Sequence, residues 1–220
     1  MGIKIEVWGD YACFTRPEFK VERVTYDAMT PSAAIGILDS IYWHPGVKYV
    51  IDKIHVLNPI KTESLMRNEV REKASISQLQ RAMKAGTTNG CCIVTQGNMR
   101  QQRSSLVLKD VRYVIEAHFE LSNAKANDEN KVMGILGERS LKGACYNQPY
   151  MGCREFVAKF RQYQGDVVIP DDAKITKDLG YMFHSYDYSD PSNPKPRFFR
   201  AILNEGTITV PSVDSGEVYL

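Results

Sequence analysis

Residues 113–121, YVIEAHFEL, alternate apolar and polar side chains with a period of two. One face carries the apolar side chains of Tyr113, Ile115, Ala117, Phe119 and Leu121. The other face is largely polar and carries Val114, Glu116, His118 and Glu120. This pattern predicts a half-buried β-strand. His118 is then either a solvated strand residue or an acid or base on an open face, because a histidine side chain suits proton transfer near neutrality. The spacing alone leaves both interpretations open.

The elements predicted around this strand follow the order β-α-β-β-α-β. An alternating strand at 3–7 comes first, and a helix follows with Thr30 as N-cap and Pro31 in its first turn. The later elements are a strand at 48–58, the strand at 110–121, a helix at 129–142 and a strand at 153–160. This is the ferredoxin-like order, in which two helices cover one sheet face. RRM-type domains hold RNA on the face that stays open.

The predicted fold class is α+β, with two domains. Residues 1–165 form the ferredoxin-like, RRM-like domain, which carries a long, poorly periodic insertion at about 61–110. A small β-rich domain at 166–220 follows, and its last two strands are predicted to form a hairpin around the turn at 204–206.

The 220 residues carry a net charge of +2, which is unevenly distributed. Residues 61–112 hold ten lysines and arginines against four acidic residues, a net charge of +6, so the rest of the chain sums to −4. A basic stretch in a near-neutral protein suggests a polyanion partner. A solvated surface insertion has the same composition, and charge alone does not separate the two.

The composition predicts a cytoplasmic protein without a cofactor. Five scattered cysteines suit a reducing compartment, and we expect no signal peptide or membrane segment. No CxxC spacing or pair of histidines one helical turn apart suggests a metal site. Phosphate-binding loops and GxSxG motifs are also missing from the sequence.

RNA cleavage is a reaction that such a chain can perform without a metal ion. The 2′-hydroxyl of RNA is the nucleophile, so the protein must supply a base, an acid and positive charge at the phosphate. A histidine with a tyrosine and a lysine or arginine suffices, and the product is a 2′,3′-cyclic phosphate. Tyr42, at the end of the first predicted helix, is a candidate hydroxyl donor, although a tyrosine there also serves in packing.

Several stretches together resemble a known family. They are residues 7–43, ending in SIYW, with HVLNPI at 55–60, RNEV at 67–70, RQQR at 100–103, DVRYVIEAHFEL at 110–121, ERSLKGACYNQPYMGCREF at 138–156 and DLGYMF at 178–183. The chain resembles the fifth CRISPR-associated protein family in its subtype I-C (Dvulg) form, within the RAMP superfamily. The resemblance spans nearly all of the sequence.

This resemblance implies a metal-independent, repeat-specific endoribonuclease. It would cut precursor CRISPR RNA at the 3′ base of the repeat hairpin and then stay on the 5′ handle of the mature CRISPR RNA. Its partners would be the backbone and large subunits of the type I-C interference complex (Cascade), with target DNA as an indirect partner. The alternative is a non-catalytic subunit that only binds the 5′ handle.

The family's catalytic set is a tyrosine, a histidine and a lysine just before that histidine. Tyr42 and His118 match, but Glu116 and Ala117 stand where relatives carry the lysine, which favours the non-catalytic alternative. Glu116 is hypothesised to hold His118 as an imidazolium. The candidates for the open cationic role are Arg67, Arg100, Arg103 and Lys142. The predicted RNA-binding residues are Arg67, Arg100, Arg103, Lys109, Lys142, Arg154, Lys20 and Arg23.

Overall fold

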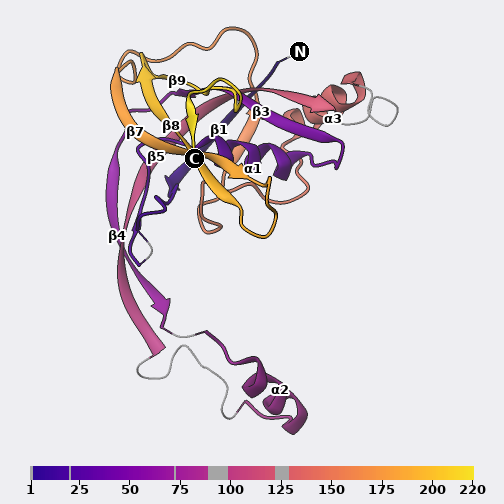
Figure 1. Ribbon diagram of the computed structural model, residues 1–220, viewed down its shortest axis with the longest axis vertical. Coiled ribbons are helices and arrows are strands. Elements are labelled where there is room, and N and C mark those ends of the chain that lie inside the picture. Colours follow the sequence, from indigo (N-terminus) through magenta and orange to yellow (C-terminus); the bar gives the residue numbers. More distant parts are fainter. Residues whose placement is uncertain (1, 20, 72, 89–98, 122–128) are drawn as a thin grey trace.

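The computed structural model describes residues 2–19, 21–71, 73–88, 99–121 and 129–220. These residues form a sheet-dominated, mixed α/β structure with three helices (Figure 1). The elements are β1 (Ile3–Ala12), β2 (Arg23–Val24), α1 (Pro31–Ile41), β3 (Val47–Val56), β4 (Thr62–Val70), α2 (Ile76–Ala85), β5 (Arg100–Leu121), α3 (Glu129–Lys142), β6 (Lys159–Gln162), β7 (Lys177–Asp187), β8 (Lys195–Asn204), β9 (Thr207–Thr209) and β10 (Val218–Tyr219). None of these described helices is long and apolar enough to cross a membrane.

One sheet runs through the described part of the chain, and β5 lies at its centre. The strand order is β10-β8-β9-β3-β5-β1-β6, with β2 and β4 paired to β5 and β7 paired to β8. β5 is antiparallel to both β1 and β3, and Ile115 lies opposite Ile5 on one side and Ile54 on the other. Directly paired residues share a face, so these isoleucines mark the buried face. The strand predicted at 110–121 is confirmed as the second half of a longer strand.

Helix α1 begins where the sequence predicts. The hydroxyl oxygen of Thr30 accepts a hydrogen bond from the backbone N–H of Ala33 at 3.3 Å. Pro31 stands in the first turn, where its missing N–H leaves no hydrogen bond unmade. The buried side chains of the helix recur every three or four residues, as Ala34, Ile37, Leu38 and Ile41. That spacing gives one apolar face, which packs on the sheet.

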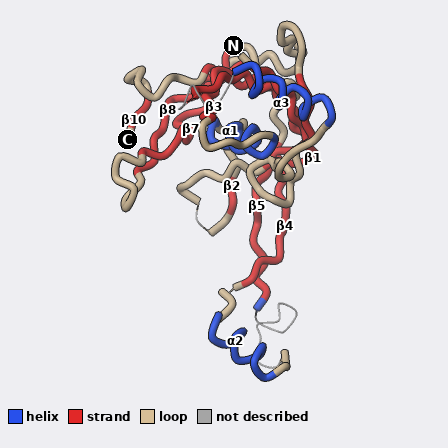
Figure 2. The backbone as a smooth tube through the Cα atoms, turned by 90° about the vertical axis from the view of Figure 1, so that its right-hand side faces the viewer, coloured by secondary structure: helices blue, strands red, loops and turns tan. Residues whose placement is uncertain are grey.

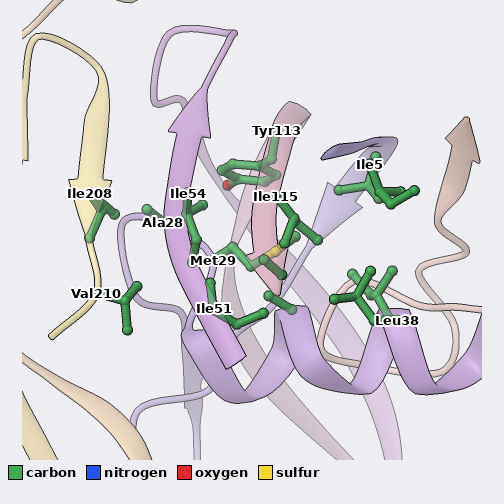
Figure 3. Close-up of a cluster of buried hydrophobic side chains, with 14 of the residues drawn as sticks. Ile5, Ala28, Met29, Leu38, Ile51, Ile54, Tyr113, Ile115, Ile208 and Val210 are labelled. Atoms are coloured by element: carbon green, nitrogen blue, oxygen red, sulfur yellow. The ribbon is translucent and has the colours of Figure 1, made fainter. Parts of the chain in front are cut away.

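The main core lies between helices α1 and α3 and the buried face of the sheet. Figure 3 shows Leu38 of α1 in the same cluster as Ile5 of β1 and Ile115 of β5. Helix α3 adds Val132 and Leu136 to this cluster. Burying each such side chain contributes about 1.5–3 kcal/mol. Because both helices cover one face, the opposite face of β1, β3 and β5 is left to their polar side chains.

The described residues between 61 and 110 form an arm that projects from the body of the sheet (Figures 1 and 2). β4 pairs with the first part of β5 from Thr62, opposite Leu108, to Val70, opposite Arg100. Helix α2 lies at the far end of the arm (Figure 2). The insertion therefore has regular structure that its sequence pattern did not predict. Side chains on both faces of β4 are at least partly exposed, so the apolar alternation that signals a strand is weak.

The C-terminal strands continue the same sheet. Glu205 and Gly206 have φ values of 47° and 79° and join β8 to β9. Two successive positive φ values suit a tight hairpin turn, and the predicted hairpin is confirmed. β9 also pairs with β3, where Ile208 lies opposite Ile54, and both appear in Figure 3. The predicted domain boundary after residue 165 stays a prediction.

The fourth strand begins later than the predicted span of 153–160, because β6 covers Lys159–Gln162. The preceding residues form a turn that packs against the end of β1. Gly152 in this turn has a φ of 79°, and a Cβ atom there would lie 2.1 Å from the carbonyl oxygen of Cys13. Cys153 is buried beside Cys13. The sequence pattern that predicted a strand from residue 153 therefore reflects the burial of Cys153 in this turn.

Candidate functional site

His118 lies on the polar face of β5, and its partner is a carboxylate. The Nδ1 atom of His118 lies 2.9 Å from Oδ1 and 3.0 Å from Oδ2 of Asp52 on β3. A carboxylate only accepts hydrogen bonds, so Nδ1 carries the proton and Nε2 is left for another partner. The two side chains are 42% and 43% exposed. The pair is therefore accessible to a large ligand.

A β-bulge in β3 brings Asp52 to this position. The pairing with β5 passes from Ile51 directly to Lys53, so Asp52 is the extra residue. A bulge bends its strand and redirects a side chain. The backbone N–H of Val210 donates to the carbonyl oxygen of Asp52 at 3.0 Å. The segment after β9 thus holds the bulge that orients the partner of His118.

Glu116 contacts other residues, contrary to the hypothesis that it holds His118 as an imidazolium. Its Oε1 atom lies 3.2 Å from Nζ of Lys4 and 3.4 Å from Nε2 of His55. Burial alone would raise the pKa of Glu116, but the hydrogen bond from Lys4 and the charges around it lower that pKa overall. Burial lowers the pKa of His55. The carboxylate beside His118 is that of Asp52, which the sequence analysis missed.

Tyr42 follows α1 and lies on the helix side of the sheet. Its carbonyl oxygen accepts a hydrogen bond from the Tyr49 hydroxyl at 2.8 Å, and the Arg139 guanidinium lies 5.3 Å from its ring. Tyr49 and Val50 are neighbours in β3 and therefore point to opposite faces. Val50 lies opposite His118. No hydrogen bond or ring contact within the described ranges joins Tyr42 to His118, and the two flank the start of β3 from opposite faces.

Two lysines accompany His118 on the polar face. Lys53 follows the bulge, is exposed, and has no ion pair in the part of the chain that the structure describes. It lies opposite Glu116, which makes it a diagonal neighbour of His118, within reach of a long side chain. Lys48 instead holds Glu120, with Nζ 3.0 Å from Oε2. Lys53 is thus the available cation beside the histidine, and the sequence analysis did not single it out.

Three of the predicted RNA-binding residues gather at the base of the arm. Arg67 is bonded to Glu155, and Nη1 of Arg103 lies 3.3 Å from Oε2 of Glu69. Arg23 contacts both glutamates, at 3.6 and 3.7 Å. Segments far apart in sequence thus form one arginine cluster that two acidic residues only partly neutralise.

This cluster lies far along β5 from the histidine. The strand runs from residue 103 to residue 118, about 50 Å at roughly 3.3 Å per residue. The arm thus leads away from His118 rather than toward it, and the arginines on it do not lie beside that residue.

The remaining predicted RNA-binding residues are dispersed. Lys109 and Lys142 are each bonded to a glutamate, at 2.8 and 2.6 Å. Arg100 and Arg154 are exposed and form no ion pair with any residue that the structure describes. Lys20 lies outside the described residues. No group of three or more potential metal ligands occurs in the described ranges.

The fold and the site together define a class of protein. It is a sheet-dominated α/β protein with helices on one face, an accessible histidine–aspartate pair on the other and a projecting basic arm. A family model described as CRISPR-associated protein (Cas_Cas5), for the Cas5d form, matches residues 2–211. The chain therefore belongs to the Cas5d family of CRISPR-associated proteins.

Two curated relatives match almost the whole chain. One, from Mannheimia succiniciproducens, is named CRISPR pre-crRNA endoribonuclease Cas5d and is 46% identical over 98% of this chain and 97% of its own length. The other, from Thermus thermophilus, carries the same name and is 37% identical over 99% of this chain and 94% of its own. A solved structure of a functionally uncharacterized protein from Streptococcus mutans is 23% identical and covers 100% of this chain and 97% of that one, with a TM-score of 0.69. The last similarity concerns the fold alone.

Proposed function

We propose that this chain is a metal-independent endoribonuclease that cuts precursor CRISPR RNA within each repeat. The observation that carries the proposal is its similarity, over nearly its full length, to two relatives named pre-crRNA endoribonucleases. The accessible pair of His118 and Asp52 supports acid–base chemistry in this chain. The cut falls at the 3′ base of the repeat hairpin.

His118 transfers the proton in the proposed reaction. Asp52 fixes the Nδ1–H tautomer, which leaves Nε2 to take the proton of the attacking 2′-hydroxyl or, once protonated, to give one to the leaving 5′-oxygen. The P–O5′ bond breaks as the bond from O2′ to phosphorus forms, so the upstream product ends in a 2′,3′-cyclic phosphate. Carboxylate–imidazole pairs orient catalytic histidines in the same way in other enzymes.

Lys53 supplies the positive charge in this proposal. Its ammonium group is exposed, has no ion pair among the described residues and lies diagonally across from His118. A cation held where negative charge develops on the phosphate stabilises the transition state by a few kcal/mol. Tyr42 acts from the helix side, where it positions the RNA as it passes the start of β3.

The arm and its arginine cluster hold the RNA away from the cut. Arg23, Arg67 and Arg103 lie together at the arm base. Phosphates can replace the two glutamates that these arginines contact, because exposed ion pairs are weak. The other RNA contacts of the proposal are Lys20, Arg100, Lys109, Lys142 and Arg154.

The finer fold layout belongs to the same proposal. The strand order β3-β5-β1-β6, with α1 and α3 on one face, supports a ferredoxin-like domain in residues 1–165. The arm is then an insertion between β3 and the second half of β5, and residues 166–220 are the β-rich part. After the cut, the protein stays on the 5′ handle in the cytoplasm. There it joins the backbone and large subunits of the interference complex.

Incubation of the purified protein with the repeat RNA of its own CRISPR array, in EDTA, tests this function. A single cut at the hairpin base, with a cyclic phosphate on the upstream product, is the expected result. Tight binding of the RNA without a cut would instead support the alternative of a subunit that only binds the 5′ handle. The absence of the family lysine, where Ala117 stands, is the observation that favours this alternative.

A further inference from the structure

A cavity of about 330 Å³ lies on the polar sheet face, where Trp8 of β1 lies opposite Arg112 of β5. Its lining includes an aromatic ring, two guanidinium groups, three carboxylates and an amide, from Trp8, Arg112, Arg161, Glu6, Asp10, Asp110 and Asn58. Its volume lies at the small end of the range for ligand sites. None of these residues belongs to the arm cluster or to the pair of His118 and Asp52.

A buried carboxylate holds the two arginines in place. Glu6 is 1% exposed, and its two oxygens accept hydrogen bonds at 2.5 Å, one from Arg112 and the other from Arg161. An arginine has five N–H donors, so most of the donors of both side chains stay available. The guanidinium of Arg161 also lies 5.6 Å from the ring centroid of Trp8. The cations are therefore preorganised beside an aromatic ring.

The backbone at the cavity is strained. Asp110 has a φ of 53°, and only one other non-glycine residue among those described has a positive φ. Asn58 donates from Nδ2 to the carbonyl oxygen of Asp110 at 2.8 Å and so supports this conformation. Strained backbone of this kind tends to occur at functional sites, where the strain sets the direction of a side chain. No hydrogen bond within the described ranges occupies the carboxylates of Asp10 and Asp110.

We propose that this cavity binds one unpaired guanine nucleotide of the RNA substrate. An aromatic ring beside an arginine is the combination on which unpaired bases stack. Guanine presents two adjacent donors, N1–H and N2–H, that a carboxylate of Asp10 or Asp110 can accept together. The nucleotide's phosphate then meets the free donors of Arg112 and Arg161.

The position of the cavity favours RNA as the occupant. Arg112 and His118 lie on the same face of β5, because their positions in the strand differ by six, an even number. The distance along the strand is about 20 Å, so one RNA strand can reach both sites. The inference rests on the proposed function, since it assigns a second contact to the same substrate.

Trp8 provides a direct probe of the cavity. The chain has two tryptophans, so Trp43→Phe leaves Trp8 as the only one. We expect GMP to quench its fluorescence saturably, and AMP, CMP and UMP to require at least about ten times the concentration. Asp10→Asn and Asp110→Asn together, in the same background, should abolish the preference for GMP. Absence of saturable quenching would overturn the proposal, and equal quenching by all four nucleotides would overturn the assignment to guanine.

Cleavage kinetics give the second readout. In single-turnover cleavage, Trp8→Ala should raise the protein concentration needed for half-maximal rate about tenfold while the maximal rate stays the same, because loss of one stacked base weakens binding only. Trp8→Phe, which keeps a ring, should recover most of the affinity and controls for folding. Tyr188→Ala, an exposed aromatic outside the cavity, is the matched control. An unchanged half-saturating concentration in Trp8→Ala would overturn the proposal. If wild type does not cut the RNA, the proposed function fails, whereas the GMP titration still decides on the cavity.

Discussion

The carboxylate of Asp52 holds the Nδ1 atom of His118 at 2.9 Å across the β3–β5 pair. This contact depends on a one-residue bulge, which the backbone of Val210 secures from the C-terminal part of the chain. A hydrogen bond to one ring nitrogen of an exposed imidazole sets its tautomer, and the tautomer determines whether the other nitrogen accepts or donates a proton. The site is therefore built by three segments distant in sequence.

Replacing Asp52 with asparagine should slow the cut without loss of RNA binding. We expect a fall of roughly 10²-fold in the single-turnover rate, because an amide allows the wrong tautomer of His118. ¹⁵N NMR of the histidine side chains should show the Nδ1–H tautomer in wild type and its loss in Asp52→Asn. The control is Glu120→Gln, which removes an exposed carboxylate two residues from His118 that pairs with Lys48. Equal rates for wild type and Asp52→Asn would show that the contact has no role in the reaction.

Lys53→Gln should reduce the cleavage rate about 10²-fold, the usual cost of losing one group that stabilises charge in the transition state. RNA affinity should change little, because one exposed lysine among many contributes weakly to binding. Lys48→Gln is the matched control, since Lys48 shares the face and strand but is engaged by Glu120. Rapid-quench measurements at saturating protein separate the two effects. If both variants cut at the same rate, the positive charge comes from another residue.

The sequence predicted the parts of the molecule that local patterns determine. The alternation around His118 defined its strand and its polar face, and the Thr30 cap and Pro31 defined the start of α1. The partner of His118 could not be predicted, because a bulge shifts Asp52 out of the regular alternation. The arm was missed because its strands are exposed on both faces and lack an apolar period.

Stability should fall as the pH is lowered from about 7 to about 5. Burial lowers the pKa of His55 and that of His184, so the unfolded chain binds more protons than the folded one below about pH 6.5. Proton uptake then favours unfolding. Urea denaturation at pH 5, 6, 7 and 8 measures how the free energy of unfolding changes with pH. His184→Gln should make this pH dependence weaker, and His44→Gln is the control. A pH dependence identical in His184→Gln and wild type would contradict the assignment.

Gly152 and Gly180 provide a matched test of the turn before β6. Both have positive φ, 79° and 74°, but only at Gly152 would a Cβ atom meet a backbone atom, the carbonyl oxygen of Cys13 at 2.1 Å. Gly180→Ala should lower the free energy of unfolding by about 1–2 kcal/mol, the cost of the left-handed conformation. Gly152→Ala should cost at least about 2 kcal/mol more, because the turn must move off β1. Similar losses in urea denaturation would show that the turn does not pack closely on β1.

The most direct test of the central claim is single-turnover cleavage of the repeat RNA in EDTA by wild type and by His118→Ala. The RNA is used unmodified and with a 2′-deoxynucleotide at the cut. We expect wild type to cut only the unmodified RNA, once, and His118→Ala to be slower by about 10²–10⁴-fold while it binds the RNA equally well. Cleavage of the 2′-deoxy substrate, or an undiminished rate in His118→Ala, would contradict the account.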